Sequence, residues 1–294
     1  MSTTARRVVA IVNPVSGRGN AGPLLRAVEQ DLRRAGASLA VEVTREAGHG
    51  AELARQVAPH VDALLIAGGD GTVSEVVNGL AGHRVPLLIL GSGTENLLAK
   101  QFGMPTDPAR VAAALLYGTP TLTDVGSVNE RRFLAVVGVG FDAEVVQRLA
   151  RVRRGHIDYF EYFWPIWRTF WAHRFPWLRV EMEGACVFEG RGLAIVGIIP
   201  RYSLGLRILQ HARHDDGLLD VCVFPCASRG QLCIHALNVA LRRHTKHAGV
   251  VYRQCRSVSI TSPDRVPVEV DGDAAGYLPV RCSVVPEAVT LLHC

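Results

Sequence analysis

The stretch from Ala63 to Leu80, ALLIAGGDGTVSEVVNGL, decides the fold of this chain. Its first five residues form an apolar run typical of a buried strand, and its last nine carry apolar residues at helical spacing. A glycine-rich turn, Gly68–Gly71, joins the two, so the sequence predicts a strand, a tight turn and a helix. The free backbone N–H groups and the dipole at the start of such a helix favour a bound phosphate.

Asp70 places a carboxylate inside this turn. Because a carboxylate would repel a bare phosphate, the arrangement makes sense if a divalent cation lies between the two. The turn therefore predicts a nucleotide bound together with Mg²⁺. The alternative is an ordinary glycine-rich loop between a strand and a helix.

The composition describes a soluble globular protein. Its 294 residues leave room for two domains, and 48% hydrophobic with 20% charged residues exclude a disordered chain. The formal charge of +5 and a pI near 9.0 suit contact with anionic lipid, nucleic acid or phosphorylated substrates, without choosing among them.

The cysteines and the apolar runs bear on location. All seven cysteines lie between Cys186 and Cys294, their number is odd, and no Cys-x-x-Cys occurs, which favours reduced thiols over a zinc site. No signal peptide is expected, because Arg6 and Arg7 lead directly into a strand-like run. No apolar run reaches the roughly 18 residues of a spanning helix. We expect a cytoplasmic protein that does not cross a membrane.

Strand and helix signals alternate over the first part of the chain, which predicts a parallel α/β sheet with ligands at the carboxyl ends of its strands. The strand-like runs there are 8–12, 39–43, 63–67 and 85–90. From about Thr121 strand-like runs dominate and predict an all-β second domain, interrupted by helical material at 143–171 and 229–244. These later runs are 133–141, 179–188, 193–199, 218–224, 257–261 and 266–270.

Three further turns carry polar side chains. Gly91–Lys100 repeats the strand, glycine turn and helix, with Thr94 either a helix N-cap or a contact to nucleotide. Asp215-Asp216-Gly217 is either an ordinary Asp-Gly turn or part of a Mg²⁺ site. Asp271-Gly272-Asp273 is either a hairpin turn or a carboxylate presented to a cleft.

The segment from Arg151 to Trp177 contains all four tryptophans of the chain, together with Arg153, Arg154 and several Tyr and Phe residues. Two interpretations stay open. The segment could be a helix packed on the second domain through its aromatic side. It could instead be an interfacial element, with Arg on lipid phosphate and aromatic rings at the headgroup level.

In their order and spacing these motifs resemble the diacylglycerol kinase catalytic superfamily, in its bacterial lipid kinase and sphingosine-kinase-like branches, nearly from end to end. The resemblance rests on Asn13-Pro14-x-Ser16-Gly17, Thr44 with Gly48-His49-Gly50-Ala51, Gly68-Gly69-Asp70-Gly71-Thr72 with Glu75 and Asn78-Gly79, Gly93-Thr94-Glu95-Asn96, and the two Asp turns. It implies an α/β domain of the NAD kinase and phosphofructokinase type, residues 1–122 completed by 286–294. A mainly antiparallel β-sandwich, residues 123–285, would follow, with the nucleotide cleft between the two.

The resemblance also implies the site residues. ATP would contact Asn13, Pro14, Ser16, Gly17, Thr44, Gly68, Gly69, Asp70, Gly71, Thr72, Glu75, Thr94 and Asn96. Asp216, with the carbonyls of Arg213 and Leu218, would hold a structural Mg²⁺. Asp273 would be the general base for a lipid hydroxyl that attacks the γ-phosphate, and Asp70 would be the second catalytic carboxylate. Phosphoryl transfer asks mainly for such positioning and charge neutralisation.

Two positions depart from the family pattern. The family usually has Asp-Gly-Glu where this chain has Asp271-Gly272-Asp273, and many bacterial members have Asp where this chain has Leu97. The expected activity is an ATP- and Mg²⁺-dependent lipid kinase that acts on a lipid such as diacylglycerol or a sphingoid base. It would dock transiently on a membrane and bind no nucleic acid.

Two alternatives to this activity stay open. One is an NAD kinase-like enzyme, which shares the Gly-Gly-Asp-Gly loop. The other is a catalytically silent nucleotide- or lipid-binding protein, which the departures at Leu97 and Asp273 favour. The acceptor lipid and the oligomeric state are open as well, with a homodimer as one option.

Overall fold

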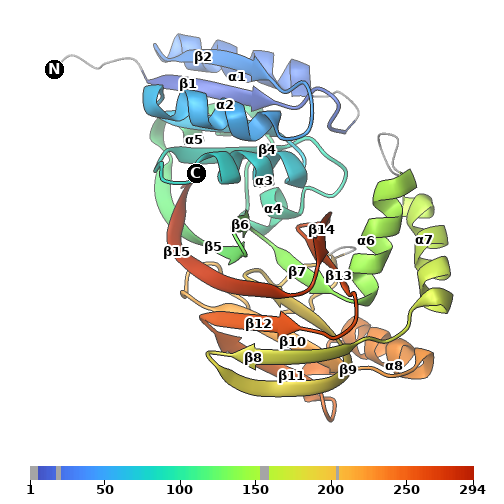
Figure 1. Ribbon diagram of the computed structural model, residues 1–294. Coiled ribbons are helices and arrows are strands. Elements are labelled where there is room, and N and C mark those ends of the chain that lie inside the picture. Colours follow the sequence, from blue (N-terminus) through green and yellow to red (C-terminus); the bar gives the residue numbers. More distant parts are fainter. Residues whose placement is uncertain (1–5, 18–20, 153–158, 203–204) are drawn as a thin grey trace. The chain divides into compact units, whose positions relative to one another are not determined.

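The computed structural model describes residues 6–17, 21–152, 159–202 and 205–294 (Figure 1). Contacts between Cα atoms divide the chain into two compact units. The N-terminal unit comprises Met1–Thr123 with Glu287–Cys294, and the C-terminal unit comprises Asp124–Pro286.

The N-terminal unit is built on a parallel sheet. Its strands are β1 (Arg7–Val12), β2 (Ser38–Val43), β3 (Ala63–Gly68) and β4 (Pro86–Gly91). They pair in the order β4-β3-β1-β2, and the end of the last strand, β15 (Val280–His293), runs parallel to β4. Each of the four strands begins and ends within one residue of the predicted run. The predicted parallel α/β fold is confirmed.

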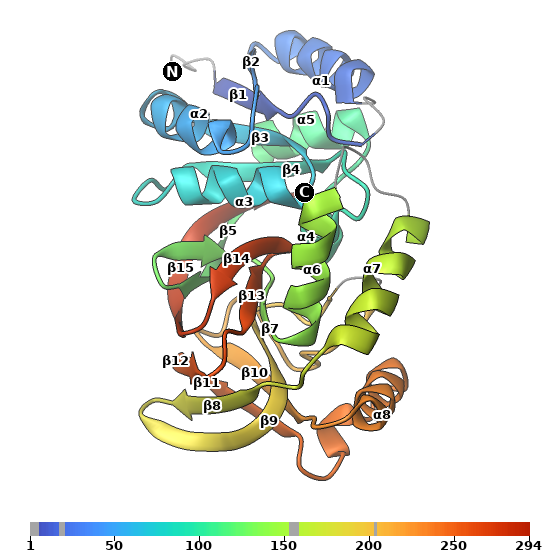
Figure 2. The same cartoon turned by 45° about the vertical axis from the view of Figure 1, so that its right-hand side comes forward.

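Helices cover both faces of this sheet. They are α1 (Ala21–Arg34), α2 (His49–Val57), α3 (Asp70–Gly79), α4 (Leu97–Gln101) and α5 (Pro108–Tyr117), with a short 3₁₀ turn at Ala58–His60. Figure 2 shows α1 beside α5 on one face and α2 beside α3 on the other. Every residue of β3 is buried as a result, which is why this strand is apolar throughout.

The C-terminal unit consists of two antiparallel sheets that share β9, with three helices. Its strands are β5 (Thr119–Val128, which begins in the N-terminal unit), β6 (Arg131–Phe133), β7 (Val136–Val139), β8 (Trp177–Met182), β9 (Ala185–Gly197), β10 (Leu219–Pro225), β11 (Val251–Cys255), β12 (Ser257–Thr261), β13 (Pro267–Val270), β14 (Asp273–Tyr277) and the first part of β15. Its helices are α6 (Phe141–Val152), α7 (Tyr159–Ala172) and α8 (Arg229–Ala240), with a 3₁₀ turn at His244–Lys246.

One of these sheets has the order β14-β13-β7-β9-β10-β11, and the other begins β9-β8-β12-β15 and continues to β5 and β6. The predicted antiparallel sandwich with helical interruptions is therefore confirmed. Among the described residues, none of the helices combines the length and the apolarity that a membrane crossing requires.

Two predicted strands prove to be divided. The run 179–188 is the hairpin of β8 and β9, because Glu183 and Gly184 both have positive φ, at 51° and 87°, as in a two-residue hairpin turn. The run 133–141 contains the end of β6, all of β7 and the first residue of α6. A side-chain carboxylate, that of Asp271, takes the N–H groups of Leu134, Ala135 and Val136. These groups are thus satisfied without a neighbouring strand, which explains the break between β6 and β7.

Candidate functional site

Three loops of the N-terminal unit meet at the carboxyl ends of its parallel strands. Asn13 follows β1, and its Nδ2 donates a hydrogen bond of 3.0 Å to the hydroxyl of Thr72 in the first turn of α3, the helix that follows β3. The Oδ1 of Asn13 accepts the Val15 N–H at 3.1 Å. The N–H of Ser92, which follows β4, donates to the Gly68 carbonyl at 3.0 Å. Predicted nucleotide contacts from separate loops are thus gathered at the sheet edge where parallel α/β folds bind ligands.

Glycines allow these loops to touch through their backbones. A Cβ atom on Gly93 would lie 2.7 Å from the Cα of Gly69, and one on Gly69 would lie 3.3 Å from the Ser16 hydroxyl. Gly17 has a φ of +64°, and a Cβ there would lie 1.8 Å from the Ser92 carbonyl oxygen. Any side chain at Gly93 or Gly17 would push the loops apart, so this part of the glycine pattern serves close packing.

Gly71 differs from these glycines, because nothing lies within 4 Å of the position that its Cβ would take. It is the second residue of α3, and the N-terminus of that helix offers backbone N–H groups and a positive dipole end. Thr44 follows β2 at the same sheet edge, where it is buried and donates its N–H to the Val12 carbonyl at 2.9 Å. The open space at Gly71 beside an anion-binding helix end fits the phosphates of a nucleotide.

Asp70 caps another helix, α4. Its two carboxylate oxygens accept the N–H groups of Leu97 and Leu98, each at 2.9 Å. Each oxygen has a second lone pair with which it could face a cation. The carboxylate is therefore held in place by α4, and the predicted role of Asp70 beside Mg²⁺ stays a prediction.

The predicted N-cap at Thr94 is wrong. Helix α4 begins at Leu97, and its cap residue is Asn96, which has a φ of 50°. The Asn96 side chain closes the preceding turn, with its Oδ1 accepting the Gly93 N–H at 2.7 Å and its Nδ2 donating to the Gly93 carbonyl at 2.9 Å. The N–H groups that Thr94 was expected to satisfy go instead to Asp70, which lies 27 positions before Leu97 and could not be found by local spacing.

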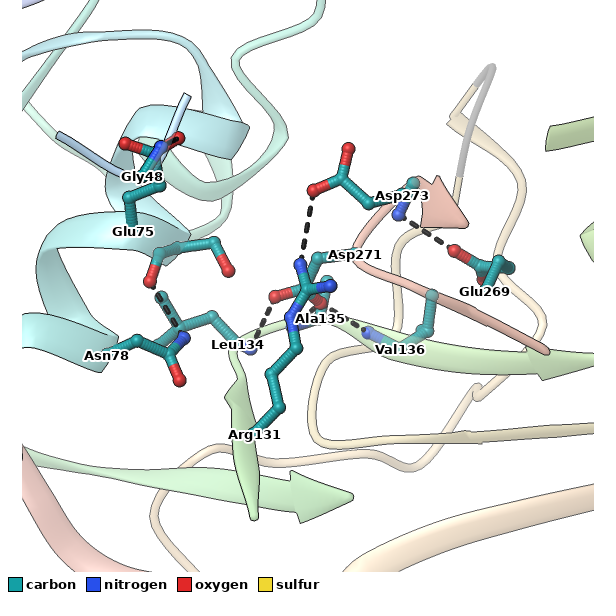
Figure 3. Close-up of polar contacts among 12 residues, drawn as sticks. Gly48, Glu75, Asn78, Arg131, Leu134, Ala135, Val136, Glu269, Asp271 and Asp273 are labelled. Atoms are coloured by element: carbon teal, nitrogen blue, oxygen red, sulfur yellow. Dashed lines mark hydrogen bonds and ion pairs between the residues drawn. The ribbon is translucent and has the colours of Figure 1, made fainter. Parts of the chain in front are cut away.

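Glu75, predicted as a nucleotide contact, caps α2. Its oxygens accept the N–H groups of Gly48 at 2.8 Å and Gly50 at 3.0 Å (Figure 3). A Cβ atom on Gly50 would lie 2.7 Å from Oε2 of Glu75, so this glycine is needed for the contact. Both oxygens of Glu75 are thus used to join α2 to α3.

The predicted metal loop, residues 213–218, lies in the C-terminal unit and is held by Asp124. The buried Asp124 accepts the Gly217 N–H at 2.7 Å and donates its own N–H to the His214 carbonyl at 2.7 Å. Asp215 binds the Arg213 guanidinium through two hydrogen bonds of 3.0 and 3.2 Å, and this ion pair holds the pKa of Asp215 below its ordinary value.

Asp216, like Asp215, is exposed. One of its oxygens accepts the Leu218 N–H at 3.1 Å, and the other lies 3.4 Å from the amide nitrogen of Gln254. The described residues contain no group of three or more His, Cys, Asp or Glu side chains that could hold a metal. Carbonyl oxygens would have to supply the remaining ligands. One carboxylate with carbonyl oxygens is a hard donor set of the kind that Mg²⁺ accepts, so the loop fits the predicted ion.

The predicted catalytic turn is the hairpin between β13 and β14. Asp271 and Gly272 have φ values of 52° and 85°, as a two-residue hairpin turn requires. The Asp271 carboxylate points into the unit, where it accepts the three N–H groups of residues 134–136 at 2.8 to 3.1 Å (Figure 3). Burial raises the pKa of Asp271 to about 6, although these N–H groups favour the charged form.

Asp273 points the other way. Its side chain is 49% exposed and forms an ion pair of 3.1 Å with Arg131, the first residue of β6 (Figure 3). The hairpin thus has two carboxylates with separate roles: Asp271 anchors the turn, and Asp273 presents an accessible carboxylate that Arg131 orients. This geometry suits the predicted general base, which stays a prediction.

Two acids lie beneath this turn, Glu269, which is buried, and Asp142, which is partly buried. Oε2 of Glu269 accepts the Gly272 N–H at 2.7 Å, while Oε1 faces Oδ2 of Asp142 across Gly138. The Tyr202 hydroxyl donates to the same Asp142 oxygen at 3.1 Å. Burial raises the pKa of Asp142 to about 6, and burial next to Asp142 raises the pKa of Glu269 well above its ordinary value.

Four side chains around the two Asp turns have no predicted role in the sequence: Asp124, Arg131, Asp142 and Glu269. Glu269 alone carried a local signal, as an acid inside the apolar run 266–270. Arg131 meets its partner Asp273 across 142 positions, and Asp124 meets Gly217 across 93. Contacts between residues so far apart in the sequence cannot be predicted from the spacing of neighbouring residues.

Two family models match the chain: the diacylglycerol kinase catalytic domain over residues 7–128, and the YegS C-terminal NAD kinase beta sandwich-like domain over residues 135–293. A diacylglycerol kinase from Mycobacterium tuberculosis is 32% identical over 296 residues, which cover 98% of this chain and 95% of that protein. One from Staphylococcus carnosus is 29% identical over 281 residues, with 94% and 91% covered.

A crystal structure from Bacillus anthracis, described as a candidate diacylglycerol kinase, matches the fold with a TM-score of 0.80 at 24% identity. The match covers 100% of this chain and 97% of that one. Together with the two family models and the relative at 32% identity, this likeness extends over both units. The chain therefore belongs to the diacylglycerol kinase catalytic-domain family, in the form that carries a YegS-type β-sandwich after the catalytic domain.

Proposed function

We propose that this protein is a lipid kinase that transfers the γ-phosphate of ATP, with Mg²⁺, to a hydroxyl of a lipid such as diacylglycerol or a sphingoid base. The observation that carries the proposal is the open space at Gly71, at the N-terminus of α3, in a chain whose relatives are named diacylglycerol kinases. A helix end of this kind binds phosphate, and the family membership makes ATP the expected source of that phosphate.

ATP supplies the phosphoryl group, and Mg²⁺ neutralises its charge when bound. The residues of this chain would bind the phosphates, orient the catalytic carboxylates and deprotonate the lipid hydroxyl. The N-terminal N–H groups of α3 would hold the phosphates, and α4 keeps the Asp70 carboxylate in one orientation beside them. Asp273, oriented by Arg131, would take the proton from the lipid hydroxyl. General-base catalysis of this kind contributes roughly 10²–10⁴-fold to the rate.

A matched pair of glycines tests the nucleotide site. Gly71 and Gly230 are each the second residue of a helix, and a Cβ on Gly230 would meet only the Ser228 hydroxyl, at 3.9 Å. Both Gly71→Ala and Gly230→Ala should fold, because Ala is the better helix former by about 1 kcal/mol. We expect Gly71→Ala to raise the Kd for ATP at least tenfold and Gly230→Ala to leave it unchanged. If Gly71→Ala and the unmodified protein bind ATP equally well, the phosphates do not lie beside Gly71 and this part of the proposal is wrong.

The activity itself is tested by transfer of labelled γ-phosphate from ATP and Mg²⁺ into a mixed lipid extract. A labelled lipid that is absent with Gly71→Ala supports the kinase, and its identity names the acceptor. Label in NADP, in a parallel reaction with NAD, would instead support the NAD kinase-like alternative. ATP binding without transfer to either acceptor would support the silent binder, which the Leu97 and Asp273 departures favour.

A further inference from the structure

Helix α7 presents three tryptophans to solvent. Trp164, Trp167 and Trp171 are 57%, 46% and 54% exposed, and their spacing places them on one side of the helix. The helix packs instead through Pro165 and Thr169, which are buried. These tryptophans therefore do not form the packed side that one of the two sequence interpretations required. Arg153 and Arg154, part of the same prediction, lie outside the described residues.

Helix α8 carries a second exposed apolar stripe. Ile234, Leu237 and Leu241, the last just after the helix end, are 49%, 60% and 53% exposed, also at intervals of three and four residues. The other side of α8 buries Leu232 and Val239. With Ile166 of α7, which is 37% exposed, seven large apolar side chains among the described residues remain uncovered on or just after these two helices, which is more than scattered exposure.

The two helices are joined at Arg229, the first residue of α8. Its Nε donates to the Phe170 carbonyl at 3.0 Å, a second nitrogen donates to the Trp171 carbonyl, and its guanidinium lies over the Trp171 ring, 5.4 Å from the centroid. Figures 1 and 2 both show the end of α7 beside α8. The exposed sides of the two helices form what we call the α7–α8 surface.

This surface is basic. Helix α8 carries no Asp or Glu, and the one acid in the sequence of α7 is Glu161, in its first turn. Arg168 lies over the Trp164 ring, 5.7 Å from its centroid, and Arg242 and Arg243 are exposed just after α8. Tryptophans interleaved with arginines that outnumber this single acid complement an anionic layer.

We propose that the α7–α8 surface docks this protein on anionic phospholipid bilayers. Indole rings prefer the boundary between headgroups and acyl chains, arginines pair with lipid phosphates, and the leucines enter the acyl region. The surface fits a second copy of the chain less well, because two faces that both carry an excess of positive charge would repel each other. The proposal rests on the proposed function, since a kinase whose acceptor is embedded in a bilayer must reach that bilayer.

The position of the tryptophans makes docking directly measurable. All four tryptophans of the chain lie between Trp164 and Trp177, so intrinsic fluorescence reports mainly on this surface. We expect a blue shift with vesicles of phosphatidylcholine and phosphatidylglycerol, little shift with phosphatidylcholine alone, and quenching by lipids brominated in the acyl chains. An unchanged spectrum with anionic vesicles that bind the protein in a flotation assay would place the contact elsewhere and overturn the proposal.

Matched variants distinguish binding through the α7–α8 surface from binding through exposed aromatic residues elsewhere on the protein. In flotation with anionic vesicles, we expect Trp167→Ala with Trp171→Ala, and separately Leu237→Glu, to lower the bound fraction at least tenfold. Tyr117→Ala, at a 78% exposed aromatic residue on α5, is the control and should bind as before. Leu237→Glu adds no cavity, so it keeps the test valid if the double variant misfolds.

The charged residues are tested in the same assay. Arg242→Glu with Arg243→Glu should weaken binding and reduce its salt dependence. Arg55→Glu with Arg84→Glu, at two exposed arginines of the N-terminal unit, changes the net charge equally and should not. If both charge variants weaken binding equally, the attraction comes from the net charge of the protein and the α7–α8 surface is not the docking site.

Docking and catalysis can fail independently. Phosphate transfer to a water-soluble short-chain diacylglycerol should be unchanged in Leu237→Glu, while transfer to diacylglycerol in anionic vesicles should fall. A protein that phosphorylates no lipid but binds vesicles through this surface would keep the docking proposal and reject the lipid kinase. Vesicle binding unchanged in the variants, with a dimer turned into a monomer in light scattering, would make this surface a self-association interface and overturn the proposal.

Discussion

The Asp70 carboxylate accepts the Leu98 N–H at 2.9 Å across 28 positions of sequence, and its other oxygen accepts the Leu97 N–H at the same distance. The carboxylate of the glycine-rich turn is therefore also the cap of α4. Leu97 stands where many members of the family have an aspartate, and in this chain its backbone contributes to holding Asp70. A substitution at Asp70 should thus change stability and activity together, and the two effects need separate measurements.

Asp70→Ala should lower the free energy of unfolding by about 1–3 kcal/mol, because two N–H groups lose a charged acceptor. Asp70→Asn should cost less, since the amide oxygen still accepts one of them. Urea denaturation measures these losses. Asp107→Ala, at the N-cap of α5, is the comparison, because loss of an ordinary N-cap lowers the free energy of unfolding by about 1 kcal/mol. If Asp70→Asn is nearly as stable as the unmodified protein and yet transfers no phosphate, Asp70 acts in the chemistry as well.

Glu75→Ala should destabilise the protein by a similar amount, about 1–3 kcal/mol, because the N–H groups of Gly48 and Gly50 lose their acceptor. Glu75→Gln retains one acceptor oxygen and should be intermediate. Both oxygens of Glu75 are used within the protein, so we expect the Kd for ATP, measured by calorimetry on folded Glu75→Gln, to change less than threefold, within roughly 0.7 kcal/mol. A tenfold loss of ATP affinity at unchanged stability would restore Glu75 as a nucleotide contact.

Asp273→Asn should lower kcat for lipid phosphorylation by roughly 10²–10⁴-fold, the usual contribution of a general base. Stability should hardly change, because the side chain is 49% exposed and its pair with Arg131 is a surface ion pair. Arg131→Ala should reduce kcat less, through lost orientation. Asp273→Glu restores the residue usual in the family and should remain active. If Asp273→Asn turns over lipid at the same rate as the unmodified protein, Asp273 is not the general base.

The two acids beneath the turn make stability depend on pH. The pKa of Asp142 is raised to about 6 and that of Glu269 is raised well above its ordinary value, so the folded state binds more protons than the unfolded state above about pH 4. The contribution of Asp142 is therefore fully favourable at low pH and is lost as the pH rises through 6, and the contribution of Glu269 is lost as the pH rises through its own raised pKa.

Glu269→Gln removes the charge and keeps an acceptor for the Gly272 N–H. Relative to the unmodified protein, its melting temperature should be similar at pH 5 and higher at pH 8. Glu130→Gln, at an exposed acid of the same unit, is the control and should show no such trend. A melting temperature of Glu269→Gln that is lower than that of the unmodified protein at pH 8 would show that the Glu269 charge stabilises the fold.

The local elements could be predicted because each depends on neighbours in sequence. The apolar run at Ala63–Ala67 is a strand in the structure, and the glycine turn after it starts α3 as expected. Prediction failed where a partner came from far away. A single strand was expected over 133–141, but the Asp271 carboxylate accepts N–H groups inside that run. The N-cap position considered for Thr94 belongs to Asn96, and Asp70 accepts the N–H groups of Leu97 and Leu98 at that helix end.

The parallel α/β sheet, the antiparallel second unit and the family could be recognised in the sequence, because the spacing of apolar residues and the residues that form turns involve only a few adjacent positions. The roles of the carboxylates could be read only from the folded protein. Asp70 and Glu75 cap helices, Asp271 anchors a turn, and Asp273 remains accessible beside Arg131. The role of each carboxylate depends on the N–H groups and cations that contact it in the folded protein. These partners lie as many as 142 positions away in the sequence.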